Sequence, residues 1–590
     1  MSRSIAFAAG LVLILPALAA ALPSAPSAAD AILACARVAR CVTETTDAVA
    51  RDTLSVWSAV PTGAVGPAAA TRLALAAYGA PAPETSPAPH AVPDAGSPSL
   101  AAAILAVYDA HAVPVDPALA RDVHAQAAAV DPAFAASLVP LLDGVADGAR
   151  AARGILPPED VALLAADPRA AMMLATFGAG PDAPAAWRDA WAPRAAALAR
   201  IDRTAVAAAA LPVVDAVAAF APPAAVPADP TAPSACPGTL DLPFVRVAGD
   251  CADEHIGTFF VLVDTGGDDT YSGAIAGGLP GAAVAIDLGA GADRYTATTM
   301  ALGFGIAGVG VLYDDGGPDR YEIVSFGQGA SAAGVGVLYD AGVADDVYES
   351  PGVNGTIATK AATLGGVGVL VDEGGNDAYH QDGLDGFVYA ASGGVGVMLE
   401  RGGDDTYVSN DIDIWLVADA GLPLIPVVAE YLGKFTGPVQ ISAEVGATAI
   451  LVEEDGDDVY VCGAHVRQGC QGAGGAGALG MLLEARGEDE YRMGASFSEE
   501  LVPGLVIFPM GQGAGYGPSA PGGVGVLADL YGSDAYTAEK WAQGFGTVGA
   551  GVLLDRGAGL DAYSIETALV GARGDGQVWA DGAAGAGADT

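Results

Sequence analysis

Hydrophobic positions along the 590-residue chain follow one spacing in the first third and another afterwards. Between residues 30 and 220, apolar side chains recur three and four positions apart in Ala-rich segments, which is the spacing of one helix face. Ser99 and Asp131 stand where helix N-termini are expected. The pattern predicts an α-helical N-terminal domain of about six to eight helices at 30–220. The Pro-rich stretch at 221–235 predicts a semi-rigid linker.

Beyond residue 236 the chain turns to short apolar runs, each ending in an acid and a glycine turn. The segment GVGVLYDDGGPDRY at 308–321 is one of ten copies of the pattern acid-x-G-x-x-D-x-Y, with small variations. Successive first acids lie 23 to 53 residues apart. Repeats of this length are typical of solenoids, in which each unit forms one coil. The repeat predicts a mainly β fold, a parallel β-helix or solenoid of about ten coils, over 236–563.

Three positions of the repeat carry its chemistry. The first acids end the strands, at Asp264, Asp287, Asp314, Asp340, Asp372, Glu400, Glu453, Glu484, Asp529 and Asp555. The second acids follow the glycine turn, at Asp269, Asp293, Asp319, Asp346, Asp377, Asp405, Asp458, Asp489, Asp534 and Asp561. The tyrosines follow the second acids, at Tyr271, Tyr295, Tyr321, Tyr348, Tyr379, Tyr407, Tyr460, Tyr491, Tyr536 and Tyr563. Two long intervals predict insertions at about 409–445 and 495–520, and residues 564–590 are expected to form a C-terminal tail.

Side chains alternate between the two faces of each predicted strand. In the strand at 308–314, Val309 and Val311 share one face, whereas Gly310 and Leu312 share the other. The bulky β-branched set is expected to fill the interior of the solenoid. The small Gly/Leu face is expected to let another backbone approach closely. Since neither face is polar, we expect both to be covered, by an insertion, the helical region or a second chain.

Stacked coils would place equivalent acids about 4.8 Å apart in two columns, and the tyrosines in an aromatic ladder. Two carboxylates at that distance repel by about 3.5 kcal/mol at an effective dielectric constant near 20. Protonation, exposure to salt water or bound cations would relieve this repulsion. Carboxylates on glycine turns, with carbonyl oxygens nearby, are ligands that calcium prefers. We therefore expect the twenty acids to be metal ligands.

The net charge of −45 lies mostly in the repeats. Residues 240–590 hold 12 basic and 50 acidic residues, a net −38, whereas residues 1–239 hold 13 and 20, a net −7. Such a surface repels nucleic acid and anionic lipid and attracts cations or basic partners. Adaptation to a salty environment and simple solubility are alternative explanations of the acids.

The turn sequences GGNDAY (374–379), GGDDTY (266–271 and 402–407) and GGPDRY (316–321) resemble the calcium-binding repeat of RTX β-roll proteins. The longer phrase GxGVLxDxGGxDxY also looks like repeats of uncharacterised secreted proteins. The resemblance implies calcium in turns shared by neighbouring coils of a secreted parallel solenoid. The chain departs from the RTX pattern in its period of about 26 residues and in lacking the middle GxG. Only the second acid matches the RTX aspartate, and a cation-free acidic surface remains the alternative.

The chain begins like a secretory signal peptide, predicted at 1–21, with Arg3, an apolar run over Ile5–Leu15 and small residues at Ala19 and Ala21. This predicts a secreted or cell-surface protein, and no later window is apolar enough to predict a membrane span. Six cysteines fall into three close pairs, and an exported chain with such pairs predicts three disulfides. The pairs are Cys35–Cys41, Cys236–Cys251 and Cys462–Cys470.

Two functions fit these features. The first is an extracellular structural or adhesive protein, a calcium-stiffened rod with a helical domain at one end. Its partner would be a cell-surface polymer, a glycan or a second copy bound through the Gly/Leu face. The alternative is a polysaccharide-active β-helix enzyme, a lyase or hydrolase. His380, His465 and Arg467 form the best cluster for catalysis, but exposed loop residues are the favoured explanation of them, and no catalytic residue is assigned.

Overall fold

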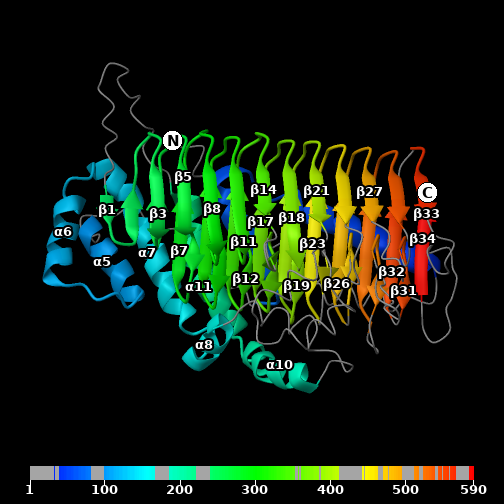
Figure 1. Cartoon of the computed structure of the whole chain (residues 1–590), viewed down its shortest axis with the longest axis horizontal. Helices are drawn as coiled ribbons and strands as arrows, with labels where there is room; N and C mark the ends of the chain where they lie inside the picture. The colour runs from blue at the N-terminus through cyan, green and yellow to red at the C-terminus, as the bar shows by residue number, and fades with distance from the viewer. Residues whose placement is uncertain are drawn as a thin grey trace, which may run out of the picture.

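The computed structural model shows a long array of parallel strands with helices against it (Figure 1). The predicted signal peptide, the linker, Cys35, Cys236, His465 and Arg467 lie outside the residues that it describes. The described residues are Ile32, 39–80, 99–166, 185–220, 240–351, 356–357, 360–384, 387–410, 442–443, 446–462, 470–475, 477–493, 511–516, 522–538, 542–547, 549–556, 559–565 and 584–589.

Three sheets run along the molecule, and their strands pair in parallel apart from β1 with β2. Sheet A has the order β1 (Leu240–Leu242), β2 (Val245–Val247), β4 (Val261–Val263), β7 (Ala282–Ile286), β10 (Val309–Asp314), β13 (Val335–Asp340), β17 (Val367–Val371), β20 (Val395–Glu400), β23 (Thr448–Glu453), β26 (Leu479–Glu484), β29 (Val524–Asp529), β32 (Ala550–Asp555) and β34 (Ala584–Asp589).

Sheet B carries the tyrosines, and sheet C consists of short strands. Sheet B has β3 (Glu254–Thr258), β5 (Thr270–Ala274), β8 (Arg294–Thr299), β11 (Arg320–Ser325), β14 (Val347–Ser350), β15 (Thr356–Ile357), β18 (Ala378–Leu384), β21 (Thr406–Asn410), β24 (Val459–Cys462), β27 (Glu490–Met493), β30 (Ala535–Ala538) and β33 (Ala562–Ile565). Sheet C has β6 (Gly277–Gly278), β9 (Phe304–Ile306), β12 (Ser331–Ala332), β16 (Thr363–Leu364), β19 (Tyr389–Ala391), β22 (Ser442–Ala443), β25 (Ala473–Gly474), β28 (Gly515–Tyr516) and β31 (Gly546–Thr547).

Successive repeats pair in register, so equivalent residues become neighbours. Asp314 pairs with Asp340 in sheet A, and Tyr321 pairs with Tyr348 in sheet B. The chain visits sheets A, B and C in turn and then enters the next repeat. This arrangement is the solenoid-like fold that the repeat predicts, and it brings the acids of separate repeats into columns.

The helices lie along the outer face of sheet A, so the expected rod with a helical domain at one end is wrong. Helix α4 contacts β13, β17 and β20, whereas α3 contacts β29, β32 and β34 near the opposite end from α6 and β1. No helix in the described ranges is both long enough and apolar enough to cross a bilayer. The described helices are α3 (Ala39–Trp57), η1 (Gly63–Val65), α4 (Gly66–Ala77), α5 (Leu100–Ala110), α6 (Pro117–Ala127), α7 (Pro132–Ala152), α8 (Pro158–Ala166), α10 (Ala185–Leu198) and α11 (Arg203–Ala219).

The two faces of the sheet A strands are the reverse of the expectation. Val309 and Val311 belong to the core shared with the helices, whereas Leu312 packs in the solenoid interior beside the tyrosines. A Cβ on Gly310 would lie 2.2 Å from the carbonyl oxygen of Phe304, so the approaching backbone is that of sheet C. Because the Gly/Leu face is interior, it is no surface for self-association.

Glutamines hold the corner between sheets B and C. The side chain of Gln328 is buried, and its Nε2 donates to the carbonyl oxygens of Tyr321 (2.8 Å) and Glu349 (3.3 Å), which belong to successive repeats. Gln471, Gln512 and Gln543 make the same pair of bonds in their own repeats. Each glutamine therefore joins two neighbouring coils where a short loop interrupts the strands.

Parts of both predicted insertions belong to the sheets, and most of each insertion lies outside the described residues. Ser409 belongs to β21, and residues 442–443 and 515–516 form strands of sheet C. The tail likewise adds a strand, since 584–589 pairs with β32. The disulfide Cys462–Cys470 is present, and Cys251 is also disulfide-bonded.

Candidate metal centre

Each repeat places its two acids on either side of a tight turn between sheets A and B. Asp314 ends β10, the turn follows, and Asp319 precedes β11. Gly316 and Gly317 have φ angles of 113° and 144°, where side chains are strained. A Cβ on Gly317 would also lie 1.7 Å from the carbonyl oxygen of Gly291. The turn therefore requires glycine, and it points both carboxylates into the corner of the solenoid.

The first acids form a buried column in which most carboxylates accept hydrogen bonds on both oxygens, whereas Oδ1 of Asp287 and of Asp529 has no partner among the described residues. Asp340 Oδ1 accepts from the backbone N–H of Gly342 at 2.8 Å, and its Oδ2 accepts from the hydroxyl of Tyr321 at 2.7 Å. From Tyr271 to Tyr491, each ladder hydroxyl donates to the first acid of the following repeat. The ladder rings stack with centroids 4.4 to 5.1 Å apart. The tyrosines therefore fix the orientation of the first acids.

The second acids form a parallel column linked by a continuous chain of hydrogen bonds. The backbone N–H of Asp293 donates to Asp319 Oδ1 at 2.6 Å, and the N–H of Asp319 donates to Asp346 Oδ1 at 2.5 Å. The chain runs from Asp253 to Asp561 with donor–acceptor distances of 2.5 to 3.1 Å. One oxygen of each carboxylate is thereby held by the preceding repeat.

The other oxygen of nearly every second acid has no hydrogen-bond partner among the described residues. These Oδ2 atoms are buried, on side chains that are at most 2% exposed. They belong to Asp269, Asp293, Asp319, Asp346, Asp377, Asp405, Asp458, Asp489 and Asp534. A buried carboxylate oxygen without a partner costs several kcal/mol unless it is protonated or binds a cation. Such a regular series therefore leaves most coils one carboxylate oxygen that a proton or a cation could satisfy.

The acids gather into groups of three whose ligand atoms lie within 4.8 Å of one another. Asp319, Asp340 and Asp346 form one such group, and Asp346, Asp372 and Asp377 form the next. The four all-aspartate groups between Asp269 and Asp377 each take one first acid and two second acids, and neighbouring groups among them share a second acid. Because each second acid is shared between two groups, there are two carboxylates per group. One divalent cation per group would therefore balance their charge. These buried Asp groups can hold metal ions.

Between Asp269 and Asp555, burial raises the pKa values of the carboxyl groups in both columns, and repulsion between neighbours raises them further. The pKa of Asp269 rises to about 6 and that of Asp293 to about 7, with desolvation as the main cause. Asp377 reaches about 8, and Asp346, surrounded by Asp340 and Asp372, reaches about 11. Hydrogen bonds from the backbone oppose these shifts. Without a cation, several of the acids are therefore protonated at neutral pH.

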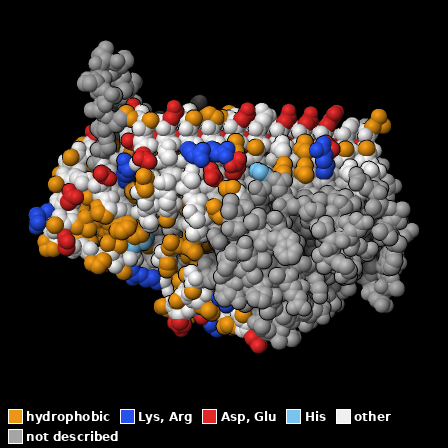
Figure 2. Space-filling view, in the orientation of Figure 1, with side chains coloured by type: hydrophobic (Ala, Val, Ile, Leu, Met, Phe, Trp, Pro, Cys, Tyr) orange, Lys and Arg blue, Asp and Glu red, His pale blue; other side chains and the backbone are white. Residues whose placement is uncertain are grey.

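Outside the columns lies a third, exposed set of acids at the position just before the second acid. Its members are Asp268, Asp345, Asp404, Asp457 and Glu488. Figure 2 shows exposed acidic side chains in a row along the upper long edge of the molecule. The same turn thus presents one acid to solvent and buries the next.

Sequence reasoning missed two residues of the first repeat, Asp253 and His255. Asp253 heads the second-acid column, and His255 pairs in register with Tyr271. The signal was present, because DEH at 253–255 matches the D-x-Y of later repeats with His in place of Tyr. Asp561, at the other end, is only half-buried.

Compared with protein-family models, curated proteins and solved structures, the chain matches none of them. The geometry of the acid columns is therefore the basis for assigning a function.

Proposed function

We propose that this protein is a calcium-binding β-solenoid of ten coils. A row of calcium ions, one per coil, would lie between the two acid columns. The observation that carries the proposal is the series of buried, unpartnered Oδ2 atoms. A cation inside a three-acid group would bind these oxygens and so give each of them a partner. Because the donors are carboxylate oxygens, a hard cation is favoured over a soft one.

Calcium fits this site better than magnesium or sodium. Magnesium demands near-ideal octahedral geometry and keeps several waters, which a corner closed by hydrogen-bonded turns does not favour. Sodium would balance only half of the charge of a group that owns two carboxylates. Calcium accepts irregular oxygen cages and supplies two charges.

We further propose that the chain works outside the cell as a rigid structural or adhesive element. Its leader-like first residues support export, and extracellular calcium is abundant enough to fill sites of modest affinity. Ordered ions would join each coil to the next and stiffen the array. A cell-surface polymer or glycan is the partner that this role requires.

Thermal unfolding of the full chain with calcium, with chelator and with high sodium chloride tests the cation sites. We expect calcium to raise the melting temperature well above its value in chelator, because each site adds about 2.7 kcal/mol at a free concentration of 100 times its Kd. Calorimetric titration should give about one calcium per repeat. Equal stabilisation by sodium would overturn the proposal in favour of salt adaptation.

A further inference from the structure

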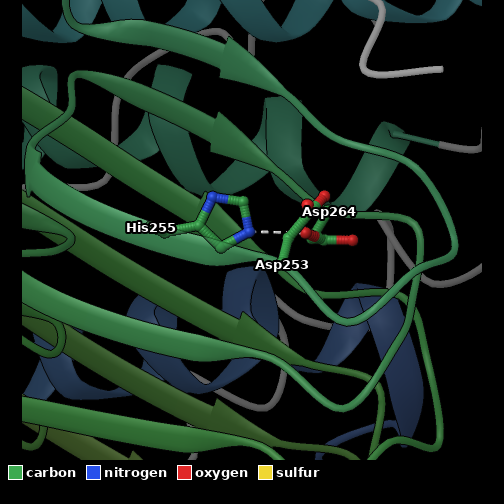
Figure 3. A group of neighbouring side chains, drawn as sticks. All are labelled: Asp253, His255 and Asp264. Carbon is green, nitrogen blue, oxygen red and sulfur yellow. Dashed lines mark hydrogen bonds and ion pairs between the residues drawn. The ribbon is translucent and has the colours of Figure 1, made fainter. Parts of the chain in front are cut away.

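The ligand group at the start of the solenoid contains a histidine, unlike the four all-aspartate groups that follow it. Asp253, His255 and Asp264 form this group, and Figure 3 shows the imidazole pointing from its strand toward the two carboxylates. His255 Nε2 lies 2.6 Å from Asp264 Oδ2, where later repeats place a tyrosine hydroxyl. The position of the donor is retained, and its chemistry changes from phenol oxygen to imidazole nitrogen.

The ring of His255 is fixed in place and fully buried. It stacks on Tyr271 with centroids 4.8 Å apart and an interplanar angle of 18°. Its other nitrogen, Nδ1, has no hydrogen-bond partner in the described part of the chain. The 2.6 Å contact needs a proton between Nε2 and Asp264 Oδ2, so Nε2 donates this hydrogen bond to the carboxylate. Because Nδ1 has no hydrogen-bond partner among these residues, the ring proton can move to Nδ1 and leave Nε2 to a metal ion.

An unpartnered carboxylate oxygen also borders this group. Asp269 Oδ1 accepts from the backbone N–H of Asp253 at 2.5 Å, which holds its carboxylate next to the group. Asp269 Oδ2 is buried and has no partner among the described residues. Asp253 is half-buried, and β3 is the terminal strand of sheet B. Of the three residues, Asp253 is therefore the one that is partly exposed.

We propose that this first group is a separate site for a divalent transition metal such as Zn²⁺, bound by His255 Nε2 and the carboxylates of Asp253 and Asp264. Imidazole nitrogen favours zinc and cobalt, whereas oxygen-only groups favour calcium. Metal would displace the proton between His255 and Asp264 and bring nitrogen and two oxygens to one ion, leaving a position for water. This site is additional to the proposed row of calcium sites and does not depend on it.

Cobalt(II) serves as the probe, since its visible absorption becomes stronger when the ion leaves octahedral water for a site with four or five ligands. The full chain, kept in saturating calcium, is titrated with Co²⁺, and Zn²⁺ is then added. We expect one equivalent of Co²⁺ to give an absorption band that Zn²⁺ abolishes. His255→Tyr restores the residue of the later repeats, so it should fold, keep its response to calcium and lose the band. His124→Ala, at an exposed position of α6, should keep the band.

Two results would overturn the site. One is a wild-type chain that binds no Co²⁺ in saturating calcium. The other is a band that survives unchanged in His255→Tyr. In either case His255 is only a hydrogen-bond donor that replaces tyrosine. A melting temperature measured on each variant separates loss of metal binding from loss of folding. If the calcium titration shows no binding, the cobalt titration still tests the His255 site on its own.

Discussion

Asp345 and Asp346 are neighbours in the chain with the same side chain, and the fold gives them opposite environments. Asp345 is exposed and accepts from the backbone N–H of Asn376 at 2.9 Å. Asp346 is buried, touches two acid groups and keeps one oxygen without a described partner. The difference teaches that burial and position between coils, and not the number of acids, make a ligand.

In the absence of cations, pH should have the largest effect on the free energy of unfolding, and the buried acid columns should cause this effect. Raised pKa values mean that the folded chain holds more protons than the unfolded chain, so unfolding free energy falls as pH rises. The fall begins near pH 4 and continues through about 6 for Asp269, 7 for Asp293 and 8 for Asp377. We expect chelator-treated protein to melt at a much lower temperature at pH 8 than at pH 5.

Calcium should flatten this dependence, because the ion takes the place of the protons. Melting curves in chelator and in calcium across this range check both statements. Stability that is independent of pH in chelator would show that the buried columns do not titrate.

Asp346→Asn should produce the next largest effect. Asp346 belongs to two acid groups, so its loss should remove two calcium ions and lower stability in calcium by at least about 1.5–3 kcal/mol, the range for a hydrogen bond to a charged group. In chelator at pH 8 the effect should nearly vanish, because a carboxyl group with a pKa of about 11 is already uncharged there, as asparagine is. Calorimetric ion counts and melting curves measure both effects, and a loss in both conditions would contradict the shared-ligand geometry.

Asp372→Asn should have a smaller effect, since a first acid belongs to a single group. We expect one calcium ion to be lost. The amide oxygen can still accept from the backbone N–H of Gly374, which lies 3.0 Å from Asp372 Oδ1. The ratio of ions lost in the two variants, two to one, is the measurement. Equal losses would mean that the second acids are not shared.

Asp345→Asn should change almost nothing. Asparagine already stands at the equivalent position 376 of the next repeat, and its amide oxygen can accept the bond from the Asn376 N–H. We expect stability to stay within about 0.5 kcal/mol and the ion count to stay unchanged. This variant is the matched control for Asp346→Asn, and loss of an ion in it would remove the distinction between the two sets.

The sequence predicts the repeat, the parallel stacking and the columns because the acids and tyrosines recur at fixed offsets. It could not assign the strand faces, since Val311 and Leu312 are both apolar and either could line an interior. The helix-covered side was decided by residues far away in the chain, such as those of α4 against β17. His255 was missed because a pattern built on tyrosine excludes the one repeat that lacks it.

The contact between α3 and the last strands sets a condition on how the molecule is made. Asp47 on α3 pairs with Arg556 at 3.0 Å, although about 500 residues of synthesis separate them. At about 5–20 residues per second, helix α3 is made roughly 25–100 s before its partner strands. A chain released before its final strands would leave the side of α3 that faces them without its cover. Premature termination near the C-terminus should therefore yield aggregating product rather than a slightly shorter protein.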